Sequence, residues 1–521
     1  MTAVADVAPA RPPENVTKNA GRGGLAIAVA KLSFIAFGFA QQLVLPAVLG
    51  TDGYGSISQV LAVVGIVNNV VVALSIQGVS RTVASATDEE APRAYRRVLG
   101  YHLVVAIVLA TGFASLGGVL ADLLAAPNIA PSLRLVGLVV LLYGLYAPIV
   151  GWLNGRRRFI DQAGLDIFYG GLRFATTVAG ILIATKVMHF DGVLGGAIGF
   201  TSAAMLILPI SAWRAGLGAP GGTAPRVASY ARFIGPLAVG LVSLNVLLQV
   251  DFLLFSRFVG QKGRLLGEAT RITQAFVGSY RAFQLFSFLP YQLLMSVTFV
   301  LFPMLAKANV DRDHVAIARY TRTGMRLAVL LVGLLAGVVM GLPYGLLRFA
   351  FADPQIAELG SKAQPFHAAA MALFALLGVT TTVLTSLRRE MWSAGLTALG
   401  VGLVVVASVA LTPAAVFGGP MMVASAFATL IGLSVTLVVA LIVLKKFAGG
   451  VVPVLTPIRV GLGVAAMVGV GSVMPFLGRF FAPLEAAALV VIYVVVLVAT
   501  REIGAADLAT VRAVISRSPK K

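Results

Sequence analysis

The sequence predicts an all-α polytopic membrane protein with about fourteen transmembrane helices. Hydrophobic residues make up 59% of its 521 residues, charged residues only 12%, and the mean hydropathy is +0.94. Soluble domains carry roughly 25% charged residues, so this chain cannot cover a water-facing surface. The apolar residues form continuous runs of helical length, which excludes the alternating pattern of membrane-spanning strands.

Fourteen apolar stretches approach or exceed the length of about 20 residues that a spanning helix needs. In chain order they are 25–49, 56–80, 99–125, 133–154, 163–188, 192–213, 229–256, 277–305, 324–347, 365–387, 391–412, 419–444, 456–477 and 482–499. The first stretch is too long for the core of a signal peptide, so we expect it to remain as a helix.

The distribution of Lys and Arg indicates the orientation. With the N-terminus in the cytoplasm, 28 of the 40 basic residues fall in inner segments and 9 in outer segments. This bias is the one that the positive-inside rule describes, so both termini are expected in the cytoplasm of a bacterium, with the protein in its inner membrane. The same distribution accounts for the net charge of +20, so no nucleic-acid partner is expected.

Cofactors and soluble domains are not expected. The chain has no cysteine, its four histidines lack metal-ligand spacing, and no glycine-rich nucleotide-binding loop is present. No connecting segment is long enough for a soluble catalytic domain. Any activity must therefore take place within the membrane or at its surfaces.

A weak internal repeat predicts two lobes. Gly53–Ser56 opens the second predicted helix, and the similar segment Val277–Tyr280 opens the eighth. This spacing favours two pseudo-symmetric six-helix lobes followed by two further helices. The predicted ranges are 1–24 for a disordered cytoplasmic tail, 25–214 for the N-lobe, 215–228 for a cytoplasmic linker, 229–446 for the C-lobe, 447–500 for the last two helices and 501–521 for a second tail.

One external segment departs from the charge pattern. Residues 260–276, with the adjacent Arg257, contain four basic side chains in a stretch that should lie outside. We interpret it as an amphipathic interfacial segment; the alternative is a vestibule lining for an anionic substrate.

The charged residues inside predicted helices include Lys31, Arg173, Asp251 and Arg281. A charge at the bilayer centre costs about 2.5–3.5 kcal/mol, so each needs a partner, a cavity or a function. We interpret the three basic residues as the cationic lining of a hydrated cavity. Alternatively, Lys31 and Arg281 reach the headgroups, and Arg173 pairs with Asp251. Polar amides occur in the same spans, among them Gln42, Asn69, Gln249 and Gln284.

Asp251 has three open interpretations. It could bind a coupling H⁺ or Na⁺, act as a permanent counter-ion for an arginine, or be solvated near the outer end of its helix. Asp166, near the start of the span 163–188, is a second candidate that could face the cavity. His367, near the start of the span 365–387, is interpreted as an interfacial polar residue.

Short motifs add a family resemblance. They are Gln42–Gly50 followed by Asp52–Gly55, Gln77–Arg81, Gly235–Leu237, Gly278–Ala282 and Leu301–Leu305. With the helix count and cytoplasmic termini, they resemble the MOP superfamily, and within it the polysaccharide-transporter branch of Wzx-type flippases for lipid-linked oligosaccharides.

The resemblance implies two lobes that rock around a central cavity to give alternating access. It implies a polyprenyl-pyrophosphate-linked oligosaccharide as substrate, in assembly of O-antigen, capsule or another polysaccharide. Membrane lipids, a polysaccharide polymerase and a chain-length regulator would then be partners. Arginine suits such a substrate because its planar fork can bind a phosphate bidentately, and Lys31, Arg173 and Arg281 would bind the pyrophosphate.

Three alternatives remain at this point. An ion-coupled multidrug exporter and a lipid II flippase would both share the fold, although cationic drugs would call for acidic cavity residues. A membrane-embedded polysaccharide enzyme would be expected to carry a large external loop or positioned carboxylates, which the sequence lacks.

Overall fold

The computed structural model describes residues 14–221 and 227–504, and every regular element in these ranges is a helix. Twelve of these helices are long and apolar enough to cross a membrane, and the first of them contains two predicted spans. The prediction of an all-α, multi-pass membrane protein is therefore confirmed.

Helix α1 (Glu14–Ala84) contains the first two predicted spans, joined by a sharp bend. Gly50 has φ 76° and ψ 167° there, a conformation that side-chain-bearing residues rarely adopt. The helix begins at Glu14, so it extends into the segment predicted as a disordered tail, while residues 1–13 lie outside the described residues. Below, the part of the molecule around Gly50 is called the Gly50 end, and the part around Lys31 the Lys31 end.

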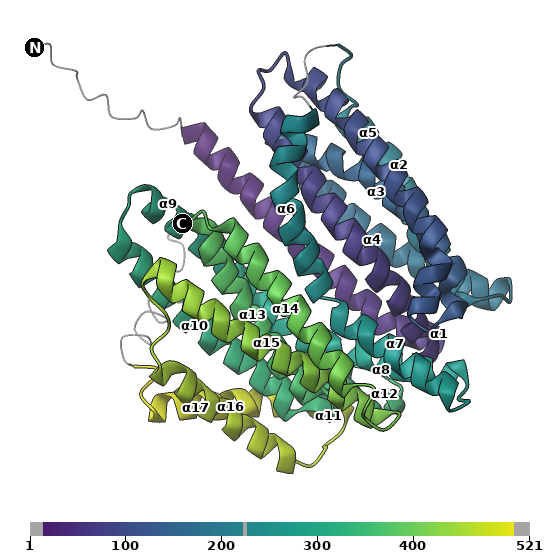
Figure 1. The fold of residues 1–521 in the computed structure, drawn as a ribbon, viewed down its shortest axis with the longest axis vertical. Helices are drawn as coiled ribbons and strands as arrows, with labels where there is room; N and C mark the ends of the chain where they lie inside the picture. Colours follow the sequence, from purple (N-terminus) through teal and green to yellow (C-terminus); the bar gives the residue numbers. More distant parts are fainter. Residues whose placement is uncertain (1–13, 222–226, 505–521) are drawn as a thin grey trace, which may run out of the picture.

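The N-lobe consists of α1 and the helices that pack on it or on each other: α2 (Ala91–Leu123), α3 (Ala130–Gly155), α4 (Phe159–Leu182) and α5 (Gly192–Ala215). A turn of π-helix, Ile183–Val187, continues α4, and a short 3₁₀ helix, Pro127–Ile129, precedes α3. In Figure 1 these helices form the blue and purple bundle, and α1 crosses the centre of the molecule.

The C-lobe begins with two helices where the sequence predicted a single span over 229–256. Helix α6 (Val227–Leu247) ends before Gln249, whose backbone leaves the helical region, and α7 (Val250–Leu265) follows. The remaining C-lobe helices are α8 (Thr270–Ser287), α9 (Leu289–Val310), α10 (His314–Gly341), α11 (Pro343–Ala350), α12 (Pro354–Gly360), α13 (Gln364–Ser386), α14 (Glu390–Leu411) and α15 (Gly419–Ala448). The short helix α12 was not predicted.

The basic segment 260–276 is built from two helix ends. Helix α7 continues to Leu265 and α8 starts at Thr270, seven residues before the predicted start. The Lys262 ammonium donates hydrogen bonds to the carbonyl oxygens of Pro413 (3.1 Å) and Ala415 (2.6 Å). This lysine therefore ties the α7 end to the loop before α15.

The last two helices, α16 (Leu455–Val473) and α17 (Ala482–Ala499), pack on α10 at the edge of the C-lobe (Figure 1). Glu502, just after α17, is buried and accepts hydrogen bonds from Arg326 of α10 and from Thr456 and Arg459 of α16. Burial alone would raise the pKa of the Glu502 carboxyl, but these hydrogen bonds outweigh it and lower the pKa.

The two lobes meet closely at the Gly50 end. A Cβ atom on Gly278 of α8 would overlap the carbonyl oxygen of Thr51, and one on Gly55 of α1 would overlap the carbonyl oxygen of Gln274. Only glycine fits these two positions without movement of the helices. We call this α1–α8 contact the glycine contact.

Two polar interactions support the glycine contact. The Thr51 hydroxyl donates to the Asp353 carboxylate at 2.5 Å, and Arg271 lies 3.6 Å from the Asp52 carboxylate. Both join α1 to a C-lobe segment at the Gly50 end. The lobes are therefore closed on each other at this end.

Candidate functional site

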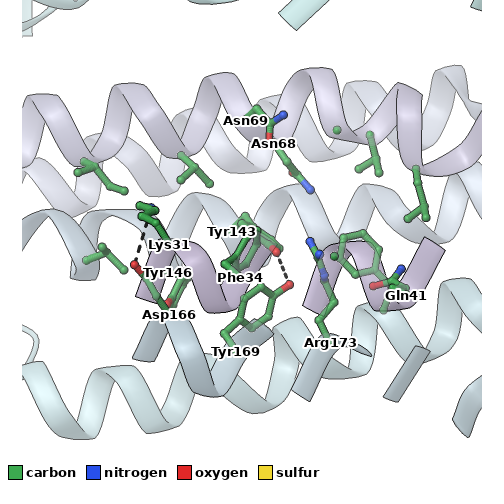
Figure 2. Close-up of a pocket in the computed structure, with 18 of the residues that line it drawn as sticks. Lys31, Phe34, Gln41, Asn68, Asn69, Tyr143, Tyr146, Asp166, Tyr169 and Arg173 are labelled. Atoms are coloured by element: carbon green, nitrogen blue, oxygen red, sulfur yellow. Dashed lines mark hydrogen bonds and ion pairs between the residues drawn. The ribbon is translucent and has the colours of Figure 1, made fainter. Parts of the chain in front are cut away.

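A cavity of about 360 Å³ opens within the N-lobe, lined mainly by α1, α3 and α4. Figure 2 shows its polar side chains in sequence along the helices: Lys31 and Asp166 at one side, a group of tyrosines in the middle, and Arg173 beyond them. The cavity lining is thus polar and aromatic at a depth where the flanking helices are strongly apolar.

A second cavity of about 290 Å³ lies between the lobes. It shares Phe34, Gly38, Gln42 and Arg173 with the first cavity and adds Arg281, Gln284 and Gln292 from the C-lobe. Arg173 of α4 and Arg281 of α8 therefore line one space from opposite lobes.

Arg173 is held by aromatic and polar groups. Its guanidinium lies 4.8 Å from the centroid of the Phe34 ring, a cation–π arrangement. Its Nε is buried and has no hydrogen-bond acceptor among the described residues. No carboxylate in residues 14–221 and 227–504 pairs with it, so Arg173 presents an uncompensated positive charge to both cavities.

Arg281 is surrounded by amide oxygens. Its Nη1 donates to Gln284 Oε1 (3.1 Å) and Gln249 Oε1 (3.4 Å), and its guanidinium lies 5.4 Å from the Phe252 ring centroid. Amide oxygens accept hydrogen bonds from a guanidinium but do not neutralise its charge. Because α8 begins at Thr270, Arg281 lies about three helical turns from the helix start rather than near the headgroups, and within the described chain it has no ion-pair partner.

Lys31 lies close to Asp166, with its ammonium 3.9 Å from the carboxylate. The lysine side chain is 62% exposed and the aspartate 16%. Asp166 therefore compensates part of the Lys31 charge. This contact distinguishes Lys31 from Arg173 and Arg281, with which the sequence analysis had grouped it.

The predicted amides lie around the same space. Gln42 lines both cavities and accepts a hydrogen bond from the Tyr54 hydroxyl at 2.7 Å. Asn69 lines the first cavity and donates to Asn245 Oδ1 of α6 at 3.0 Å, which links the lobes at a second place. Gln284 lines the second cavity, and Gln249 lines neither cavity but accepts a hydrogen bond from Arg281.

Asp251 is buried at 2% exposure and is not solvated at the end of its helix. One of its oxygens, Oδ2, accepts from Gln284 Nε2 (2.9 Å), His367 Nε2 (2.9 Å) and the Tyr280 hydroxyl (3.2 Å). The proposed pairing with Arg173 is wrong, because His367 takes that place.

His367 was missed as a site residue. It was interpreted as interfacial because it lies one turn from the start of an apolar stretch, yet it is fully buried. The rings of Tyr280, Phe283 and Phe288 pack around it, and hydropathy does not reveal such packing. Asp251 could have indicated this role, because a carboxylate buried in an apolar helix needs a hydrogen-bond donor such as a histidine.

Three tyrosines were also missed. Tyr143 and Tyr146 of α3 and Tyr169 of α4 line the first cavity, with Tyr169 centred 5.5 Å from Tyr143 and 5.8 Å from Tyr146. The Tyr143 hydroxyl donates to that of Tyr169 (Figure 2). Tyr169 follows Asp166 by three residues and precedes Arg173 by four, so this spacing on α4 could have indicated a shared face.

The fold and the cavities define a class: a polytopic helical membrane protein whose two lobes enclose a cationic polar space. Solved transporter structures share this fold. A lipid II flippase MurJ in an inward closed conformation is 12% identical, with a TM-score of 0.73, over 91% of this chain and 98% of that chain.

An inward-facing multidrug-resistance MATE transporter of the MOP superfamily is 13% identical, with a TM-score of 0.64, over 82% of this chain and 98% of that chain. The MATE transporter VcmN of Vibrio cholerae is 12% identical, with a TM-score of 0.58, over 83% and 97%. No family model and no curated protein matches the sequence. The chain thus has the fold of MOP-type transporters.

Proposed function

We propose that this protein is a flippase that moves a polyprenyl-pyrophosphate-linked oligosaccharide across the inner membrane by alternating access, for assembly of O-antigen, capsule or another polysaccharide. The observation that carries the proposal is the placement of Arg173 and Arg281. They come from opposite lobes, line one cavity and have no carboxylate partner in the described chain. A pyrophosphate can bind both guanidinium groups at once.

The rest of the cavity suits a sugar chain. Tyrosine rings offer apolar faces on which sugars can pack, and the amides of Gln42 and Asn69 offer donors and acceptors to hydroxyls. The polyprenyl tail would remain in the lipid. The protein therefore needs to shield only the polar head, whose passage through hydrocarbon would cost several kcal/mol for each unsatisfied group.

The test is binding of undecaprenyl pyrophosphate to the purified protein in lipid nanodiscs. We expect Arg173→Gln and Arg281→Gln each to weaken binding about tenfold or more, since hydrogen bonds to charged groups contribute about 1.5–3 kcal/mol. Arg264→Gln is the matched control, because Arg264 is exposed on the α7 end. Equal affinity of both cavity variants and the wild type would refute the proposal.

A lipid II flippase is the second candidate. It is favoured by the structural likeness to MurJ over 91% of the chain, and it would use the same phosphate-binding cations. The two candidates are distinguished by complementation. Growth of a strain depleted of its own lipid II flippase, restored by this protein, would select the second candidate.

An exporter of cationic drugs fits the cavity less well. Such a substrate calls for an unpaired acidic group, whereas Asp166 lies beside Lys31 and Asp251 is enclosed by hydrogen-bond donors. Drug resistance conferred on an exporter-deficient host, lost in Asp166→Asn, would instead favour this third function.

A further inference from the structure

The first cavity contains buried polar atoms that have no hydrogen-bond partner within the described chain. Gln41 and Asn68 of α1 are 4% and 5% exposed, and their carbonyl oxygens, Oε1 and Oδ1, accept no hydrogen bond from a described residue. Arg173 Nε and the Tyr146 hydroxyl are also buried and lack a partner among residues 14–221 and 227–504. All four residues line this cavity. Because an unpaired buried polar atom is costly, their presence around one cavity indicates a ligand that pairs with them.

The bend at Gly50 allows both halves of α1 to line this cavity. Gly38 and Gln41 lie about one turn apart on the first half of the helix, and Gly65 and Asn68 on the second. Gly65 leaves space in the cavity, because a Cβ atom there would meet nothing within 4 Å. The volume of about 360 Å³ is within the range of sites for small ligands.

Complementarity to the unpaired atoms indicates an amide group in the ligand. Carbonyl oxygens only accept hydrogen bonds, so Asn68 and Gln41 need donors, whereas Arg173 Nε only donates and needs an acceptor. In Figure 2 the side chains of Asn68 and Arg173 point toward each other from opposite sides of the cavity. A secondary amide between them would donate its N–H to the first and accept at its C=O from the second.

The charge and the apolar lining of the cavity disfavour other groups. A sugar ammonium would be repelled by Arg173, and a sugar carboxylate would bring only acceptors to the two unpaired carbonyl oxygens. A hydroxyl both donates and accepts, but it leaves uncovered the apolar part of the lining, which includes Phe34, Val72 and Ile76. The methyl group of an acetamido group would bury apolar surface against such side chains.

The position of the first cavity next to the two arginines identifies which sugar it would hold. Arg173 lines both the first cavity and the second one, where Arg281 comes from the other lobe. A diphosphate between the two guanidinium groups would therefore have the sugar attached to it next to the first cavity. Since C1 of that sugar carries the phosphate, the substituent on C2 is the nearest to the diphosphate.

We propose that the first cavity binds a 2-acetamido sugar joined directly to the diphosphate, an inference that rests on the proposed function. Asn68 Oδ1 accepts from the acetamido N–H, Gln41 Oε1 accepts from a sugar hydroxyl, and Arg173 Nε donates to the acetyl oxygen. Selection of the first sugar is thus a property of the N-lobe, whereas both lobes bind the diphosphate.

The first test uses sugars without a diphosphate. Saturation-transfer NMR on the whole protein in nanodiscs compares methyl N-acetylglucosaminide and methyl N-acetylgalactosaminide with methyl glucoside and methyl galactoside. We expect saturation of the acetyl methyl protons, and binding at least about tenfold weaker for the sugars without the acetamido group, because the buried atoms then stay unpaired. Equal binding of the two kinds of sugar, or binding of neither, would overturn the proposal.

Two variants test where the sugar binds. Asn68→Leu removes an acceptor and Gly65→Leu fills the space, so each should lose the preference for the acetamido sugars. Gln59→Leu is the control for the first, because Gln59 is fully buried and unpaired in the described chain but lines neither cavity. Gly112→Leu is the control for the second, because a Cβ at Gly112 also meets nothing within 4 Å. A preference that survives in both cavity variants would overturn the proposal.

The second test uses lipid-linked probes and separates this proposal from the proposed function. We expect the wild type to bind undecaprenyl diphospho-N-acetylglucosamine or its galactosamine analogue at least about tenfold more tightly than undecaprenyl diphosphoglucose. Asn68→Leu should remove this difference and keep the wild-type affinity for undecaprenyl pyrophosphate itself. Failure of the wild type to bind undecaprenyl pyrophosphate would refute the proposed function. Normal binding of that lipid, with equal affinity for the lipid-linked sugars, would refute only the acetamido site.

Discussion

Two tyrosines show how single residues organise the site. Tyr54 and Tyr280 belong to the two similar segments Gly53–Ser56 and Val277–Tyr280, and both are fully buried. The Tyr54 hydroxyl donates to Gln42 and that of Tyr280 to Asp251, each on a preceding part of its own lobe. These two tyrosines thus orient one amide at the cavity and one carboxylate behind it.

A prediction at this scale concerns Lys31. If Asp166 compensates its charge, Asp166→Asn should free Lys31 for the anion and tighten undecaprenyl pyrophosphate binding. An exposed ion pair contributes about 0.2–1 kcal/mol, so the expected gain is about 1.5- to 5-fold. Lys31→Met should cancel the gain when combined with Asp166→Asn. Weaker binding by Asp166→Asn alone would show that the carboxylate itself contacts the ligand.

Among the elements, the α16–α17 pair depends on one buried carboxylate. Glu502 joins Arg326 of α10 to Thr456 and Arg459 of α16, so it fixes two helices that otherwise make mainly apolar contacts with the C-lobe. Residues 505–521 lie beyond the described part of the chain.

We predict that Glu502→Gln lowers the midpoint of thermal unfolding, through a loss of about 1–3 kcal/mol as the charged hydrogen bonds weaken. The Glu502 pKa is lowered in the folded protein from its ordinary value of 4.5. Its stabilisation is therefore complete above about pH 4.5 and is lost as the pH falls through the folded-state pKa. Melting curves across this range should show the acid-side loss in the wild type and in the exposed control Glu89→Gln, but a smaller loss in Glu502→Gln. Identical curves would contradict the role of Glu502.

The positions of the helices could be predicted from the sequence more closely than their ends. Each of the twelve helices able to span a membrane overlaps a predicted stretch, because the cost of burying polar backbone and side chains in lipid is large. The predicted span 277–305 is instead divided between α8 and α9. Hydropathy placed the start of α8 too late, since four of the five residues in Thr270–Gln274 are polar although helical, and this error moved Arg281 toward the headgroups. It also missed the break at Gln249 between α6 and α7, where no proline or glycine signals an interruption.

At the scale of the whole molecule, the glycine contact joins the lobes at the Gly50 end, and a cavity lies between them at Arg173 and Arg281. The glycine contact and the Thr51–Asp353 hydrogen bond fix this arrangement. The sequence could predict that deep cations share a cavity, since each charge in lipid needs one. It could not predict that Arg173 and Arg281 meet across the lobes while Lys31 is compensated, because these facts depend on how distant helices pack.

We predict that Gly278→Ala separates the lobes at the glycine contact and increases access to the cavity from the Gly50 end. Since the chain lacks cysteine, a single Asn69→Cys reporter can measure this access with a membrane-impermeant maleimide applied from the side that the positive-inside rule predicts to be outer. Gly112→Ala is the control, because a Cβ there meets nothing within 4 Å. Equal labelling of both variants, at equal thermal stability, would show that the contact does not control access.

The position of Arg173 and Arg281 on opposite sides of one cavity also has a consequence for the protein without bound substrate. Two like charges on opposite lobes repel each other, so the empty cavity favours a wider spacing of the lobes at these residues. If the substrate is the proposed diphosphate, its binding should reverse the sign of that force and draw the two arginines together. Small buffer anions such as phosphate should imitate this compaction, and buffer composition should therefore influence which shape of the empty protein is observed.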